Sequence, residues 1–110
     1  MKNKELKFKL PKKIRILNVT FKVDYNKSEG GGFFDFGENT IGIGTKHLDR
    51  DPEAVFEIFV HEIGEAIHCL LNTRYQAGGN ERDYVFVQDH KQFQNHITIL
   101  SGIIHEQLLK

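Results

Sequence analysis

The segment from Pro52 to about Asn72 carries apolar side chains at spacings of three and four residues, the pattern of an amphipathic helix with one buried face. Asp51 suits the N-cap, because its carboxylate can accept a hydrogen bond from a free amide of the first turn, and Pro52 suits the first helical position. A helix with one apolar face must bury that face against another layer, so the rest of the chain has to supply that layer. The expected stripe consists of Phe56, Phe59, Val60, Ile63, Ile67, Leu70 and Leu71.

The residues before this helix predict a small sheet. Apolar and polar residues alternate over residues 14–24, and the alternation changes phase at Leu17 and Asn18. This change predicts either two short strands around a tight turn or one strand with a bulge. After a glycine-rich turn at residues 28–32, segments 33–36 and 40–43 predict two further strands joined by a short turn. The first half of the chain is therefore expected to be a small, mostly antiparallel sheet.

The residues after the helix predict a loop and a second helix. Residues 73–82 include adjacent glycines and are expected to form a loop. Asp89 and Gln92 have the spacing of a capping box that opens a helix. A small sheet and two packed helices make an α+β domain, and 110 residues are enough for a single domain with one core. We expect residues 1–9 to be a flexible basic arm. The stripe expected on the last helix consists of Phe93, Ile97, Leu100, Ile104 and Leu108.

Composition excludes several classes of function. Fifteen Lys and Arg residues balance fifteen Asp and Glu residues, so no global charge favours nucleic acid or a membrane surface as partner. No apolar run approaches the roughly 20 residues of a membrane span, and the amino terminus has no apolar signal core. Cys69 is the single cysteine, which favours a reducing compartment and predicts a cytoplasmic protein.

The sequence His61-Glu62-Ile63-Gly64-Glu65 indicates a metal site on the first helix. Side chains at positions i and i+4 share one helix face, so His61 and Glu65 can bind the same ion. Zinc accepts an imidazole nitrogen and a carboxylate oxygen as ligands. Glu62 stands beside the first ligand, where a carboxylate can activate water. The alternative is that these side chains are only the solvated polar face of an amphipathic helix.

A third ligand is expected from the last helix. Counting back from Phe93 and Ile97 places His90 on the face expected to point inward, and such a ligand would complete a zinc site with one open position. A histidine there can instead be a core residue that binds no metal. His68 lies three residues after Glu65 and is either an alternative ligand or a second residue that orients a ligand or the water. The remaining histidines have no partner spacing and are expected at the surface: His47, His96 and His105.

The order of strands, glycine-rich loop, strand, His-Glu helix and last helix resembles the minimal zincins, and more narrowly small metallopeptidases encoded by phages and mobile elements. The resemblance covers about residues 10–109. It implies that His61 and residue 65 are metal ligands, that Glu62 is the general base and that His90 is the third ligand. Members of this family commonly have a second histidine where this chain has Glu65.

This resemblance implies a zinc-dependent metallopeptidase with one divalent ion per chain and a peptide or protein substrate. Zincins usually hold the substrate as an added strand at a sheet edge, and Thr40 to Gly44, just before the metal helix, is the expected edge. Two alternatives remain. One is a catalytically inactive, metal-binding module for protein interaction with the same fold. The other is a metal-free structural domain.

Overall fold

The computed structural model describes residues 6–71, 74–76, 84–86 and 89–110. Four strands form the main sheet: β1 (Lys13–Ile16), β2 (Val19–Asn26), β3 (Gly32–Asp35) and β4 (Thr40–Gly44). Helix α1 (Pro52–Leu70) follows, then a two-stranded sheet of β5 (Arg74–Gln76) and β6 (Tyr84–Phe86). The described chain ends with α2 (His90–Ile103), which continues into a π-helical turn, η1 (Ile104–Leu108). The fold is α+β, as the sequence predicts.

The main sheet is mixed, with the strand order β1-β2-β4-β3. β1 and β2 form an antiparallel hairpin, β2 runs parallel to β4, and β3 and β4 are antiparallel. The hairpin turns at Leu17 and Asn18, which confirms the interpretation of the phase change as two strands around a turn. Leu17 has a positive φ, a conformation that is unfavourable for a residue with a Cβ atom.

The expectation that Thr40–Gly44 is a sheet edge is wrong. β4 pairs with β2 on one side and with β3 on the other, and all five of its residues are buried. This strand is rich in Ile and Gly because neither of its faces offers room for polar side chains. The terminal strands of the main sheet are β1 and β3.

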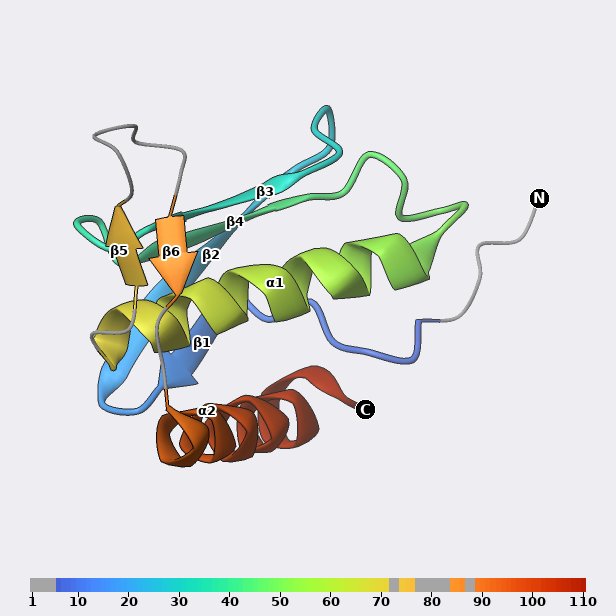
Figure 1. Cartoon of the computed structure of the whole chain (residues 1–110). Helices are drawn as coiled ribbons and strands as arrows, with labels where there is room; N and C mark the ends of the chain where they lie inside the picture. Colours follow the sequence, from blue (N-terminus) through green and yellow to red (C-terminus); the bar gives the residue numbers. More distant parts are fainter. Residues whose placement is uncertain (1–5, 72–73, 77–83, 87–88) are drawn as a thin grey trace.

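Helix α1 lies along one face of the sheet, and α2 lies beside α1 (Figure 1). The core forms between the sheet and α1, where Phe59, Ile63 and Ile67 are fully buried against inward-facing strand residues. The predicted start and approximate length of α1 are confirmed: the Asp51 carboxylate accepts a hydrogen bond from the Ala54 amide at 3.2 Å. The strand residues that fill the core are Ile14, Ile16, Phe21, Val23, Ile41 and Ile43.

Helix α2 begins with the predicted capping box, in which Asp89 and Gln92 exchange hydrogen bonds of 2.9 and 2.8 Å. Its buried face is the predicted one only in part: Leu100, Ile104 and Leu108 pack against the core, as expected. Phe93 and Ile97 are 48% and 43% exposed, whereas His96 is only 6% exposed. The apolar residues of this helix fit two overlapping helical phases, one through positions 93 and 97 and one through positions 96, 99, 100 and 103. Packing on α1 and β1 buries the phase that contains 96 and 103.

Phe8 anchors the described part of the amino-terminal segment to the core. Phe8 is 5% exposed and contacts the rings of Phe56 and Phe59, and it forms an isolated β-bridge with Leu109. The flexible arm expected at residues 1–9 therefore does not extend to Phe8, while residues 1–5 lie outside the described residues. Of the loop expected at residues 73–82, Arg74–Gln76 is a strand and the remaining positions lie outside the described residues.

Candidate metal site

Helix α1 brings the three predicted residues His61, Glu62 and Glu65 together. One potential ligand atom from each lies within 4.8 Å of the other two. His61 Nε2 lies 3.0 Å from Glu65 Oε2 and 3.9 Å from Glu62 Oε2. The first distance follows from the helical repeat, because residues four apart stack on one face. An imidazole nitrogen and carboxylate oxygens at these separations are a donor set that fits a divalent first-row metal ion.

The cluster runs from solvent into the protein. The His61 side chain is 67% exposed, Glu65 is partly buried at 18%, and the Glu62 side chain is buried at 6%. Glu62 lies at the border between the solvated face of α1 and the face packed on the sheet. The site therefore combines an open approach to His61 with a carboxylate shielded from bulk water, which strengthens the electrostatic interactions of that carboxylate.

The position of Glu62 depends on a close approach between α1 and β3. Gly32 begins β3, and a Cβ atom there would lie 2.6 Å from Ile58 Cγ2, 2.7 Å from the Gly42 carbonyl oxygen and 3.1 Å from Glu62 Cγ. These distances leave no room for a side chain. Gly32 thus permits the helix face that carries Ile58 and Glu62 to pack directly on the strand backbone.

Apart from this cluster, a pair of histidines lies where α1 meets α2. The rings of His68 and His96 have centroids 4.2 Å apart. Burial lowers the pKa of both imidazoles, and the pKa of His68 is lowered further by the neighbouring His96. Burial disfavours the charged form, so both rings are held toward the neutral state that can act as a metal ligand.

The predicted third ligand, His90, is the first residue of α2 and is exposed. It does not belong to the group formed by His61, Glu62 and Glu65, which is the one such group within the described residues. His68 is partly buried and also lies outside that group. The expectation that His96 lies at the surface is wrong, because the buried phase of α2 runs through it. Counting from Leu100 and Ile103 instead of from Phe93 would have found it.

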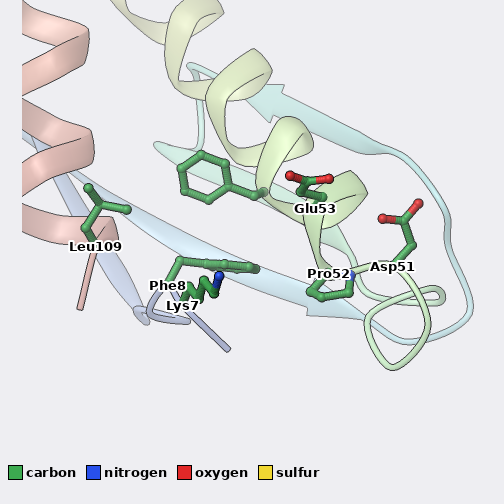
Figure 2. Close-up of a pocket in the computed structure, with 7 residues that line it drawn as sticks. Lys7, Phe8, Asp51, Pro52, Glu53 and Leu109 are labelled. Carbon is green, nitrogen blue, oxygen red and sulfur yellow. The ribbon is translucent and has the colours of Figure 1, made fainter. Parts of the chain in front are cut away.

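The other histidines lie away from the cluster. His105 is exposed on η1, as predicted, whereas His47 is partly buried and its Nδ1 lies 3.4 Å from an Arg50 guanidinium nitrogen. A surface hollow of about 390 Å³ lies at the amino-terminal end of α1, where Lys7, Phe8 and Leu109 also line it (Figure 2). Pro52 lines it, and His61 lies more than two helical turns further along α1. This hollow is therefore separate from the cluster.

Compared with models of protein families, with curated proteins and with solved structures, the chain shows no match. None of the helices in the part of the chain that the structure describes is long and apolar enough to cross a membrane.

Proposed function

We propose that this protein is a zinc-dependent metallopeptidase in which His61 and Glu65 hold the ion and Glu62 is the general base. The observation that carries the proposal is the geometry of one helix: a histidine nitrogen 3.0 Å from one carboxylate oxygen and 3.9 Å from a second, buried carboxylate. The donor types fit zinc. The resemblance to small phage metallopeptidases supports the same roles for these positions.

A bound zinc ion would acidify water and polarise the peptide carbonyl group. The residues of the chain supply the remaining chemistry. The Glu62 carboxylate, held next to the ligands, accepts the proton of the attacking water and then delivers it to the leaving amine. Glu65 in place of a neutral histidine adds negative charge around the ion, so we expect weaker acidification of water than with two histidines.

We further propose that the substrate is a peptide in extended conformation that lies beside β3. β3 is a terminal strand of the sheet and packs against α1, and a Cβ atom at its first residue, Gly32, would lie 3.1 Å from Glu62 Cγ. A peptide added as a strand there would present its backbone to the cluster. We therefore propose the edge at β3 for substrate binding, in place of the edge that the sequence predicts at β4, because β4 is an interior strand.

The test has a binding step and a catalytic step. We expect about one zinc per chain by elemental analysis, and loss of zinc in His61→Ala and Glu65→Ala. Zinc at 100 times its dissociation constant should stabilise the fold by about 2.7 kcal/mol, and chelation should remove this gain. Hydrolysis is then measured by mass spectrometry of a mixture of peptides incubated with the protein. Glu62→Gln should keep zinc and lose hydrolysis; an unchanged rate in this variant would exclude Glu62 as the base.

A catalytically inactive, metal-binding module for protein interaction is the second candidate, and exposed aromatic residues favour it. Phe33 and Phe36 are 53% and 46% exposed. Phe33 is paired with Gly42, and its ring lies where a Gly42 side chain would be, on the sheet face opposite α1. Zinc binding without turnover of any peptide, together with a partner whose affinity falls in Phe33→Ser, would select this function over hydrolysis.

A further inference from the structure

The two histidines at the start and in the middle of α2 have opposite environments. His90 is exposed, whereas His96 is 6% exposed and lies between α2 and α1. A ligand contributed by α2 has to face α1, since α1 carries His61 and Glu65. On this criterion His96 is placed to contribute, and His90 is not.

The contacts of His96 locate its ring on α1. Its Nε2 lies 3.9 Å from the point where Gly64 would carry a Cβ atom, and its ring centroid is 4.2 Å from that of His68. Gly64 follows His61 by three residues and immediately precedes Glu65. Residues three apart on a helix have Cβ positions about 5–6 Å apart, so the His96 ring reaches the part of α1 next to His61.

Two features of this contact suit a ligand. His96 Nδ1 is buried, and it has no hydrogen-bond partner among the residues that the structure describes. An unsatisfied buried polar atom costs about 1–3 kcal/mol; coordination of an ion by Nδ1 itself would offset that cost, whereas coordination through Nε2 would not. Gly64, inside a helix, costs about 1 kcal/mol relative to alanine, and here it leaves open space in front of the ring.

We propose that His96 is the third protein ligand of the ion held by His61 and Glu65, and that His68 packs on His96 to orient it. The donor set is then two histidines and one glutamate, one of the sets that bind zinc in catalytic sites with an open position. His96 lies outside the 4.8 Å cluster, so His61 has to turn toward α2, and its 67% exposed side chain has room to do so. The inference rests on the proposed metal site but not on peptidase activity.

The experiment measures zinc affinity by competition with a chromophoric chelator for the full chain and for variants at His96, His90, His68 and His61. His96→Leu removes the donor and keeps apolar volume at the helix interface, and His90→Leu is the matched control on the same helix. We expect more than 100-fold weaker zinc binding for His96→Leu and less than threefold for His90→Leu. His68→Leu should weaken binding by about 10–100-fold, as expected for a residue that orients a ligand.

Several outcomes overturn the inference. One is zinc affinity within threefold of wild type in His96→Leu; another is a loss confined to His90→Leu. Undiminished affinity in His61→Ala, with loss in both His68→Leu and His96→Leu, would mean that the histidine pair forms a site of its own. If His96→Leu melts at a lower temperature than wild type, two further measurements separate lost ligation from lost packing. They are the zinc affinity of His96→Asn and the rise in Tm that zinc produces in each variant. Peptides left intact by a protein whose zinc affinity depends on His96 would refute the peptidase and leave this ligand assignment standing.

Discussion

Gly32→Ala should destabilise the protein, although it adds only one methyl group. Gly32 does not have a positive φ, so its requirement is for space and not for a special backbone conformation. The new Cβ would lie 2.6 Å from Ile58 Cγ2 and 2.7 Å from the Gly42 carbonyl oxygen. The Ile58 methyl group can move with its side chain, but the Gly42 oxygen belongs to the central strand β4.

The magnitude follows from how far these atoms must move. Ile58 Cγ2 has to retreat by about 0.8 Å to reach an ordinary contact distance of 3.4 Å, and the strand carbonyl by a similar amount. Overpacking of this kind costs about 1–3 kcal/mol. Replacing glycine by alanine in a strand recovers about 0.5–1 kcal/mol of backbone entropy, which offsets part of that cost. We expect a net loss of about 1–2 kcal/mol, or a fall in Tm of about 5–10 °C for a domain of this size.

The assay is urea unfolding followed by circular dichroism, with Gly31→Ala as control. A Cβ at Gly31 would have no heavy atom within 4 Å, so this neighbouring substitution should leave the free energy of unfolding nearly unchanged. Equal stability of the two variants would refute the argument that the contact between α1 and β3 is closed to a side chain at Gly32.

Three further predictions concern single contacts. Burial raises the pKa of the Tyr25 hydroxyl, which donates to the Pro11 carbonyl oxygen, so the folded protein holds that proton more tightly than the unfolded chain. Stability should therefore fall as pH rises above about 10, and Tyr25→Phe should remove this fall and cost about 1 kcal/mol at neutral pH in urea unfolding. Leu17→Asn should raise stability by about 0.5–1 kcal/mol in the same assay, because asparagine tolerates the positive φ at this position, and a loss would contradict this. The Gln107 amide exchanges hydrogen bonds of 2.8 and 2.7 Å with the backbone of Arg15 at the outer side of β1. Gln107→Ala should cost about 1 kcal/mol, and unchanged unfolding would show that water replaces both bonds.

The parts of the fold that were predicted correctly depend on local signals. Asp51 and Pro52 define the start of α1 by the hydrogen bonds and φ angle of the first turn, and Asp89 and Gln92 do the same for α2. The phase change at Leu17 locates the first hairpin, because side chains on a strand alternate with a period of two. The clustering of His61 with Glu65 follows from the helical repeat alone.

The parts that were not predicted depend on contacts between distant segments. β4 is interior because β2 pairs with it in parallel, and no local signal specifies that pairing. Phe8 is buried because Leu109, near the other end of the sequence, pairs with it and α1 supplies ring contacts. The phase of α2 was misjudged because Phe93 and Ile97 are apolar but exposed, so periodicity alone could not distinguish its two faces.

The proposed base and the proposed third ligand are positioned from different sides of α1. Glu62 is positioned from the sheet side, where Gly32 allows α1 to rest on the strand backbone. His96 approaches from the opposite side, where α2 packs over Gly64. A change on the sheet side should therefore disturb the base and spare the ligands, and a change in α2 should disturb the ligands first. On this proposal the shielded carboxylate of Glu62 and the buried ring of His96 are held by different neighbours of α1, and the ion would lie between them beside the exposed His61.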